Sequence, residues 1–427
     1  MNERPITVGL LGCGVVGSGV VQLLTEHAEA IATRVGAPVR LGPVAVRDPQ
    51  RARDVDLEQL TDDPFAVIAD PEVDVVVEVI GGIEPARTLV HRAIDSGRSV
   101  VTANKELIAN HGPELKALAG EKGARLEYEA AVAGGIPIIK PLRESLAGDR
   151  IRRVLGILNG TTNFILTRMA EEQMSFQDAL AEAQGLGYAE ADPSADVDGH
   201  DAASKAAILA SLAFDAEVLA EHVHREGIRA VTSTDIDHAA RMGYAVKLLG
   251  IAEEVDGSIN ARVHPALVPR THPLASVRES FNAVFTEGDA SGELMFYGRG
   301  AGSLPTASAM LGDIVTAARA LRAGERPNGQ TVTTKPIRPF EEVDVQSYVL
   351  LDVADAPGVL AEVASTFGAH GVSIKSVWQE GRADHAQLLL ITHRAREAAL
   401  QATLTDLRGL GSVRDIASVM RVEGEEL

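Results

Sequence analysis

The chain has 427 residues, a length that suggests roughly three domains, and 45% of them are hydrophobic, which is ample for several packed cores. A net charge of −20 argues against a surface that binds nucleic acid, and the single cysteine excludes an intrachain disulfide and argues against a thiolate metal cluster. No stretch approaches a membrane span or a secretory signal, so we expect a cytoplasmic protein in a reducing compartment.

A dinucleotide-binding motif is predicted at the start of the chain. The segment ITVGLLGCGVVGSGVVQLL predicts a strand over 6–11, a glycine turn and then an apolar helix. Gly12 would make the tight turn, Gly14 would let the backbone approach a pyrophosphate, and Gly17 would let the helix pack closely on the strand. A merely glycine-rich turn is the alternative, but the flanking strand and helix favour dinucleotide binding. Cys13 is interpreted as a packing residue rather than a nucleophile.

The residues after the second predicted strand, 43–46, bear on the choice of cofactor. An acidic residue at this strand tip binds the ribose 2′-hydroxyl of NAD, whereas an arginine accommodates the 2′-phosphate of NADP. Here Arg47 precedes Asp48, and Arg51 and Arg53 follow closely. NADP is favoured, and Asp48 leaves NAD open.

Further parallel strands are predicted at 73–80, 99–102 and 125–129, with a helix at 113–122. The strand at 99–102 delivers Lys105 to the carboxyl edge of the sheet, where open α/β sheets bind ligands. Lys105 is therefore either a ligand-binding residue or a solvated loop lysine. After the last strand, Glu129 and the carbonyls of the small-residue segment AAVAGGIPII offer oxygen ligands for a hard cation, but the residues by themselves favour a tight crossover between domains.

A second domain is predicted from residue 146, where the pattern changes to β-like runs and amphipathic helices. Helices are expected at 163–172, 176–184 and 200–214, and the segment 246–293 alternates short β-like runs with polar turns. A glycine-rich approach then leads to a helix at 306–321, which we expect to pack back on the nucleotide domain.

The helix predicted over 200–214 carries the pair Asp201 and Lys205, one turn apart on the same face. That face continues through Ile208, Leu209 and Leu212, so the lysine stem lies on the stripe expected to face the core. An exposed ion pair on a surface helix is the simpler interpretation. The preceding loop is dense in carboxylates, which suits the binding of an ammonium group or a metal but also ordinary solvation: Glu190, Asp192, Asp196 and Asp198.

The C-terminal part follows a linker rich in Pro, Gly and Thr, which we assign to residues 324–345. Beyond it, strands are predicted at 347–353, 372–378, 386–392 and 416–422, and helices at 358–370 and 395–408. This is the βαββαβ order of the ferredoxin-like plan. A purely structural dimerisation module and a small-molecule sensor both fit this unit.

Several motifs, in this order, resemble homoserine dehydrogenase over the first two domains: GLLGCGVVG, VTANKE, YEAAVAGGIPI, GILNGTTNFIL and GAGSLPTASA. The segment DAPGVLAEVASTFGAHGVSIKSV resembles the ACT domain, with Asp355, Pro357 and Gly358 in the turn before its first helix. The resemblance implies an α/β chain with a Rossmann domain (1–145), an α+β substrate and dimerisation domain (146–323), and a ferredoxin-like ACT domain (346–427).

The resemblance also assigns residues. Lys205 would transfer the proton, helped by Asp201, with Lys105 near nicotinamide and substrate. The substrate residues would be Gly187, Glu190, Asp192 and Asp201, and a sodium site would use Glu129, Val132, Gly134 and Ile136, which reverses the interpretation of that turn. The nucleotide residues would be Gly12, Gly14, Val15, Val16, Gly17, Arg47, Ile80, Gly81, Lys105 and Gly302.

The implied reaction interconverts L-homoserine and L-aspartate 4-semialdehyde with NADP or NAD, in threonine, methionine and isoleucine biosynthesis. Hydride transfer to an aldehyde leaves charge on oxygen, so a cation beside it and carboxylates for the substrate ammonium suit this chemistry. L-Threonine is the expected effector, removal of 341–427 is expected to abolish its effect, and a homodimer or homotetramer is expected.

Three rival functions share parts of this pattern. A semialdehyde dehydrogenase needs a thiol nucleophile, and Cys13 in the glycine turn is unsuited to that role. A different reductase on the same scaffold remains open, as does a nucleotide-sensing regulator, which would have no need of Lys205.

Overall fold

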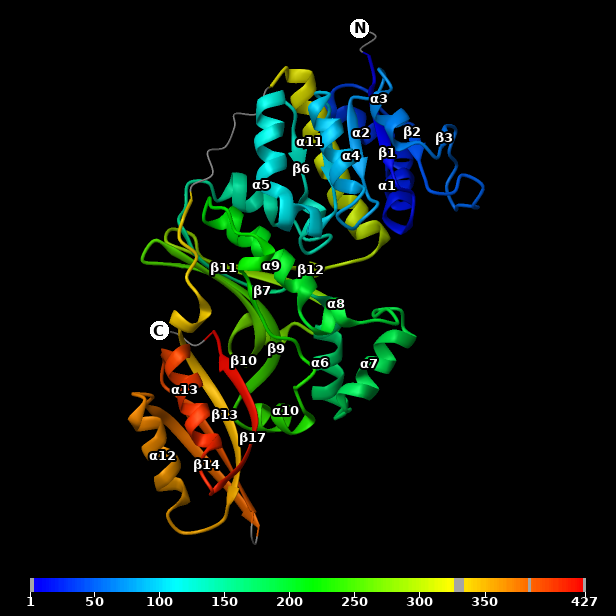
Figure 1. The fold of residues 1–427 in the computed structure, drawn as a ribbon. Helices are drawn as coiled ribbons and strands as arrows, with labels where there is room; N and C mark the ends of the chain where they lie inside the picture. Colours follow the sequence, from blue (N-terminus) through cyan, green and yellow to red (C-terminus); the bar gives the residue numbers. More distant parts are fainter. Residues whose placement is uncertain (1–3, 326–333, 383–384, 425–427) are drawn as a thin grey trace. The chain divides into compact units, whose positions relative to one another are not determined.

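The computed structural model describes residues 4–325, 334–382 and 385–424 (Figure 1). Contacts divide the chain into two compact units that interleave along the sequence: the first comprises 1–154, 204–222 and 282–335, and the second 155–203, 223–281 and 336–427. Elements distant in sequence share a core in each unit, and the domain limits at 145, 323 and 345 stay a prediction. In the described ranges, no helix is long and apolar enough to cross a membrane.

A six-stranded parallel sheet forms the centre of the first unit. Its strand order, β3-β2-β1-β4-β5-β6, is that of a dinucleotide-binding fold and confirms the predicted Rossmann architecture. The register pairs Ile6 with Val39, Val8 with Val75, and Val100 with Leu126. The strands are β1 (Ile6–Leu11), β2 (Val39–Ala45), β3 (Leu60–Thr61), β4 (Val75–Glu78), β5 (Ser99–Thr102) and β6 (Leu126–Glu127).

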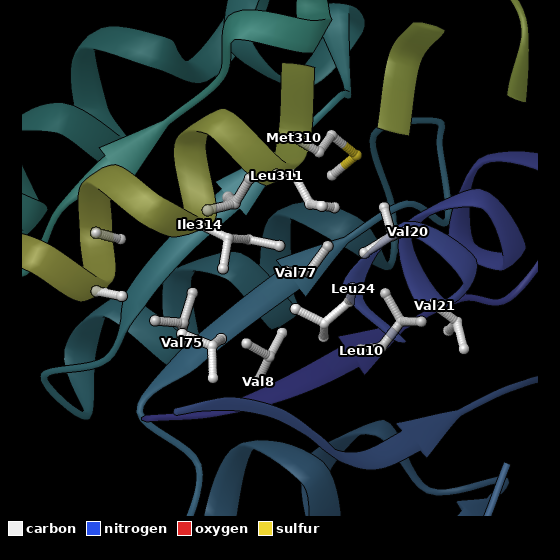
Figure 2. Packing of buried hydrophobic residues seen from close by; sticks show 14 of the residues in the cluster. Val8, Leu10, Val20, Val21, Leu24, Val75, Val77, Met310, Leu311 and Ile314 are labelled. Carbon is white, nitrogen blue, oxygen red and sulfur yellow. The ribbon is translucent and has the colours of Figure 1, made fainter. Parts of the chain in front are cut away.

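One face of this sheet is covered by helices from both ends of the chain: α1 (Val15–Glu26), α2 (Ala28–Val35) and α11 (Ser303–Ala323). Alternate strand residues such as Val8 and Val75 point to this face, as buried parallel strands require. Met310 and Ile314 of α11 close the same core (Figure 2). The nucleotide unit therefore completes its core with residues from beyond position 300.

The other face carries α3 (Pro64–Ala69), α4 (Ala86–Asp95) and α5 (Lys105–Lys122). Gly9 faces this side, where a Cβ would lie 2.7 Å from Val67, so the close approach of α3 needs a glycine. The prediction that the helix begins at Pro113 is wrong. Asn104 starts it eight residues earlier by accepting a hydrogen bond from the Leu107 N–H at 3.1 Å, and Pro113 lies inside the helix.

The second unit holds α6 (Gly160–Glu172), α7 (Phe176–Gly185), α8 (Ser194–Val197) and α10 (Ser233–Arg241), together with the strands β8 (His224–Arg225), β9 (Tyr244–Val255) and β10 (Ser258–Pro269). Two elements cross the division between the units: β7 (Ile151–Ile157) and α9 (His200–Ala213). The hairpin of β11 (Phe281–Gly288) and β12 (Gly292–Arg299) belongs almost entirely to the first unit. The β-rich character expected for 246–293 is confirmed.

The C-terminal elements follow the predicted βαββαβ order. They are β13 (Asp344–Ala354), α12 (Val359–Ala369), β14 (Ile374–Arg382), β15 (His385–Thr392), α13 (Glu397–Arg408) and β17 (Val413–Val422), with the two-residue strand β16 (Ala395–Arg396) beside β13. The strand order β17-β13-β15-β14 is that of a ferredoxin-like sheet. Leu351, Leu388 and Leu390 pack under the two helices in a core of their own.

This C-terminal sheet does not end at its own edge, because β17 pairs in parallel with β10 through Ala266 with Arg421 and Leu267 with Val422. Strands β9, β10, β17, β13, β15 and β14 are consecutive neighbours in one sheet. The Glu423 N–H adds a hydrogen bond to the Leu267 carbonyl at 3.0 Å. A tethered ACT module was predicted, whereas the ACT strands extend the sheet of the substrate domain.

Buried ion pairs reinforce this junction. Arg262 of β10 has no exposed surface and binds Glu253 at 2.6 Å and Glu423 at 3.0 Å. Arg421 of β17 binds Glu226 at 2.7 Å and Glu397 at 2.5 Å. Buried charges such as these are tolerated only when they are paired, so removing one partner would destabilise the junction strongly.

Part of the predicted linker also belongs to the junction. Residues 326–333 of that linker lie outside the described ranges, but Ile337 forms a bridge with Ile259. Phe340 is buried, and its ring stacks on His224 with centroids 4.2 Å apart and lies beneath the Arg421 guanidinium. Residues 336–343 are therefore packed structure rather than spacer.

Candidate functional site

The glycine turn after β1 has the geometry of a pyrophosphate cradle. Gly12 has φ +99°, and a Cβ there would lie 2.9 Å from the Val79 carbonyl oxygen. A Cβ on Gly17 would lie 2.5 Å from the Gly12 carbonyl, whereas one on Gly14 would meet nothing within 4 Å. Gly12 and Gly17 thus permit tight packing, and Gly14 leaves open space beside the backbone where α1 begins.

A cleft of about 590 Å³ lies over this turn, and its walls include Gly14, Arg47, Ile80, Pro85 and Leu89. Val15, the residue after Gly14, is 73% exposed. The Val16 side chain instead packs against the hydrophobic core, so only the Val16 backbone can contact a nucleotide. The cleft, with its glycine turn, fits a dinucleotide.

The tip of β2 presents both arginine and carboxylate side chains to this cleft. The Asp48 carboxylate accepts a hydrogen bond from the Gln50 N–H at 2.9 Å, and Arg53 donates to the Asp48 carbonyl at 2.8 Å and the Arg51 carbonyl at 2.6 Å. Arg47 lines the cleft and is exposed, with no carboxylate paired to its guanidinium among the described residues. Arg51 also lines the cleft and is exposed, so Arg47 and Arg51 both offer guanidinium groups that can bind an anion.

The start of α11 meets the glycine turn directly. Ser303 donates from Oγ to the Val15 carbonyl oxygen at 2.7 Å, and a Cβ on Gly19 would collide with Ser303. Gly302 precedes α11 with φ +128°, a conformation that favours glycine. The structure thus brings Gly302 close to the nucleotide turn, although nearly 290 residues separate them in sequence.

A buried carboxylate that the sequence interpretation missed organises the neighbouring loop. Glu78, at the end of β4, is fully buried and accepts hydrogen bonds from the Ile80 N–H at 2.7 Å and the Gly81 N–H at 3.1 Å. Thr102 donates to its other oxygen at 2.5 Å. An acidic residue closing an apolar run was the available signal, because such a residue is buried only when it has partners.

The same network reaches Lys105. Thr102 Oγ1 accepts a hydrogen bond from the Asn104 N–H at 3.0 Å, and Asn104 donates from Nδ2 to the Gly82 carbonyl at 2.6 Å. Asn104 also caps α5, whose first residue is the half-buried Lys105. The loop at 80–82 and the base of Lys105 are therefore held by one set of hydrogen bonds.

Lys205 and Asp201 lie one turn apart on α9, and both are buried, with 9% and 7% of their surface exposed. The interpretation as an exposed surface pair is therefore wrong for this helix. Asn159 donates from Nδ2 to Asp201 at 2.9 Å and to Asp196 at 2.7 Å, which holds the Asp201 carboxylate in place. A buried lysine beside a fixed carboxylate is an arrangement associated with proton transfer.

Helices α5 and α9 also share a cavity in the first unit. Ile108 and Ile208 both line a space of about 250 Å³. Each lies three residues beyond a candidate lysine, Lys105 on α5 and Lys205 on α9, so each lysine shares a helix face with a residue of this cavity. The residues expected to contact nicotinamide and to transfer the proton thus belong to one compact unit.

The acidic loop belongs to the second unit. Gly187, Glu190 and Asp192 are exposed, and Gln184 donates to the Glu190 carbonyl at 2.9 Å, which fixes the backbone but leaves the Glu190 carboxylate outward. A hydrogen bond from Ser194 lowers the pKa of Asp192 below its usual value. Glu190 and Asp192 are accessible anionic groups that suit an ammonium ligand.

The other carboxylates of this loop have structural partners. Asp198 forms a two-point ion pair with Arg229 at 2.5 and 3.2 Å, and this arginine holds the pKa of Asp198 down. Asp196 accepts the Asn159 hydrogen bond described above. Of the four carboxylates in this loop, Glu190 and Asp192 are therefore accessible, whereas Asp196 and Asp198 are bound by neighbouring side chains.

The predicted sodium turn is buried and closely packed. The Glu129 carboxylate accepts hydrogen bonds from the N–H groups of Ile138, Ile139 and Lys140 at 2.6, 2.7 and 2.9 Å, so it faces a helix start rather than a cation. The carbonyls of Val132 and Gly134 accept no hydrogen bond within the described part of the chain. A cation at this turn would therefore be held by backbone oxygens.

Comparisons with known proteins cover the chain from end to end. Residues 137–315 match the family described as Homoserine dehydrogenase, residues 12–129 match Homoserine dehydrogenase, NAD binding domain, and residues 347–412 match ACT domain. A homoserine dehydrogenase from Corynebacterium glutamicum is 50% identical over 425 residues, covering 98% of this chain and 96% of that protein.

Solved structures give the same result. A homoserine dehydrogenase from Thiobacillus denitrificans superposes with a TM-score of 0.94 at 42% identity and covers 99% of both chains. A hyperthermophilic archaeal homoserine dehydrogenase in complex with NADPH superposes with a TM-score of 0.64 at 29% identity, covering 76% of this chain and 99% of that one.

Proposed function

Because the chain belongs to the homoserine dehydrogenase family, we propose that it interconverts L-homoserine and L-aspartate 4-semialdehyde, with NADP favoured over NAD, in threonine, methionine and isoleucine biosynthesis. The observation that carries the proposal is the buried Lys205 one turn from Asp201 on α9. The oxidoreductase class and a nicotinamide dinucleotide cofactor follow from the family match.

Lys205 moves the proton in this proposal. The nicotinamide supplies or accepts the hydride when the cofactor is bound. In the direction of reduction, the Lys205 ammonium donates a proton to the oxygen that gains charge, and in oxidation the neutral amine takes the hydroxyl proton. Asp201, fixed by Asn159, keeps the lysine oriented.

The substrate ammonium is assigned to the exposed carboxylates Glu190 and Asp192, with Gly187 in the same loop. Lys105 adds a second cation for the reacting end of the substrate. Its start-of-helix position and the Asn104 network keep its backbone fixed, which reduces the entropy lost when it engages a ligand.

Two ionic preferences are part of the proposal. Arg47 is an exposed cation at the tip of β2, with Arg51 in the same cleft, while the Asp48 carboxylate accepts a hydrogen bond from Gln50, an arrangement that favours the 2′-phosphate of NADP. The buried carbonyls of Val132 and Gly134, with those of Glu129 and Ile136, suit a sodium ion that would fix the turn beside the start of α11.

Regulation by L-threonine and assembly as a homodimer or homotetramer complete the proposal. The ACT match supports an amino-acid effector. A ligand that binds a less active state more tightly by a few kcal/mol would suffice for inhibition.

Initial rates test these claims together. We expect homoserine-dependent reduction of both cofactors, with a higher kcat/KM for NADP, and higher activity in sodium than in potassium. No reduction with homoserine at any cofactor concentration would contradict the proposed reaction. Equal rates in the two salts would contradict only the proposed sodium site. A higher kcat/KM with NAD would contradict only the proposed preference for NADP.

A further inference from the structure

A cavity of about 130 Å³ lies within the second unit between α10 and the ACT strands β14 and β15. Its strand side is formed by two cross-strand pairs, Trp378 with Leu389 and Glu380 with Gln387. Since Leu388 and Leu390 point into the core beneath α12 and α13, the residues between them face away from those helices. The cavity therefore opens on the face of the ACT sheet that its own helices leave uncovered.

The walls of the cavity carry one charge of each sign. Arg241, at the end of α10, contacts Glu380 on β14 through both of its terminal nitrogens. Both side chains are more than half exposed, so the pair adds little to stability and can open at small cost. An incoming carboxylate could replace Glu380 at Arg241, and an ammonium could replace Arg241 at Glu380.

The third polar group is His238, one turn before Arg241 and Met242 on α10. The residue is 7% exposed and lines the cavity, and its Nδ1 has no hydrogen-bond partner in the described ranges. A buried polar atom without a partner is unfavourable, so a ligand that supplies a hydroxyl or amide group would recover that loss. Trp378, which is 45% exposed, and Leu389 supply an apolar wall beside it.

We propose that this cavity binds a small zwitterionic α-amino acid with a polar side chain, and is the effector site of the chain. The carboxylate would bind Arg241, the ammonium would bind Glu380, and the side-chain polar group would reach His238. The volume is several times the roughly 30 Å³ of one liquid water, enough for a short amino acid but not for a nucleotide. This proposal rests on the threonine regulation proposed above and places it away from the turn at Asp355.

The position of α10 connects such a site to the catalytic helix. Helix α10 packs against α6 as well as against β9. The residue that caps α6 is Asn159, whose side chain also holds Asp201. A ligand that pulls Arg241 and His238 against the ACT sheet would shift α10, and α6 would carry that shift to the Asp201 carboxylate.

The test uses the full chain, because removing 341–427 would delete β17 and leave Arg262 without Glu423. L-Threonine is titrated by calorimetry and, separately, into the dehydrogenase assay, with Arg241→Gln, Glu380→Gln and Asp355→Asn variants. Arg408→Gln is the matched control, since it removes an exposed arginine of the ACT domain that does not line the cavity. We expect threonine affinity to fall at least about tenfold in the Arg241 and Glu380 variants, the scale of one lost charged hydrogen bond, with uninhibited kcat unchanged.

The outcomes separate the site from the regulation. Unchanged threonine affinity in both cavity variants, or a loss confined to Asp355→Asn, overturns the site and leaves threonine regulation standing. If the unsubstituted chain is an active dehydrogenase that neither binds threonine nor is inhibited by it, the regulation fails and this site fails with it. Weakened binding in the cavity variants, with Arg408→Gln unchanged, supports the site.

Discussion

Lys205 is the residue on which the proposed chemistry depends most directly. We expect Lys205→Met, which keeps an unbranched apolar stem in the buried position, to lower kcat at least about a hundredfold while NADPH binding, followed by its fluorescence, is retained. Lys122→Met is the control, because Lys122 forms a surface ion pair with Asp95 and should be silent. Near-normal turnover in Lys205→Met would refute its role in proton transfer.

Glu78 acts through the loop that it holds. In Glu78→Gln one oxygen can still accept from Ile80 and Gly81, but the new amide nitrogen faces Thr102, whose hydroxyl then has no acceptor there. We expect a KM for the cofactor several-fold higher and a free energy of unfolding lower by about 1–3 kcal/mol, the scale of a buried unsatisfied group. Thr102→Val removes the same hydrogen bond to residue 78 and also the acceptor of the Asn104 N–H, so the double variant should lose less than the sum of the two single variants. A purely additive double variant would show that the two side chains do not act together.

At the scale of the element, the tip of β2 carries the prediction on cofactor choice. Arg47→Asp replaces an exposed cation in the cleft by an anion, so NADP affinity should fall more than NAD affinity, by about tenfold or more in their ratio. Arg51→Asp is a useful comparison because it changes the same charge four residues further along the chain. An unchanged NADP to NAD ratio in Arg47→Asp would show that Arg47 does not face the 2′-phosphate.

The elements also show how far a single sequence leads. The glycine turn, β5 and the βαββαβ order could be predicted from the sequence, because the period of the apolar residues and the positions of the glycines can be read from neighbouring residues. They were misleading at α5, where Pro113 looked like a first-turn residue and Asn104 had already capped the helix.

Long-range contacts were beyond such reasoning. The pairing of β10 with β17 and the hydrogen bonds of Glu78 with Thr102 and of Asn159 with Asp201 join residues 24 or more positions apart, and nothing in the flanking residues marks those partners. Among the site residues, burial turned Lys205 from an ambiguous surface lysine into a strong candidate. The accessible Glu190 and Asp192 became distinct from Asp196 and Asp198 only when their partners were known.

At the scale of the whole molecule, the junction between β10 and the ACT strands should respond to acid. His264 is fully buried there, and burial, followed by the neighbouring Arg421 and Arg262, lowers its pKa to about 4, against the opposing pull of Glu423 and Glu226. Its folded pKa lies below the unfolded value of 6.5, so the unfolded chain takes up the proton first as the pH falls. Stability is full above pH 6.5 and declines toward pH 4, by up to about 1.4 kcal/mol per pH unit.

Urea unfolding between pH 7.5 and 4.5 measures this slope. We expect His264→Asn to reduce the slope of unfolding free energy against pH by an amount that corresponds to the uptake of nearly one proton. His91→Asn, which changes an exposed histidine, should leave the slope unaltered. Glu226 does not obscure the effect, because its pKa is held at about 2 and its contribution is retained until the pH falls below 4.5. The same slope in His264→Asn as in the unsubstituted chain would mean that the histidine is not neutral in the folded state.

The position of α11 in the nucleotide core has a consequence during synthesis on the ribosome. The apolar face formed by Val8, Leu10, Val75 and Val77 is complete in sequence well before residue 129, yet its cover includes Met310 and Ile314. At 5–20 residues per second, roughly 10 to 40 s separate the two events. Throughout that interval α1 and α2 can cover only part of this valine- and leucine-rich surface, so a chaperone that shields such surfaces should influence the yield of this enzyme more than that of one whose Rossmann unit is contiguous.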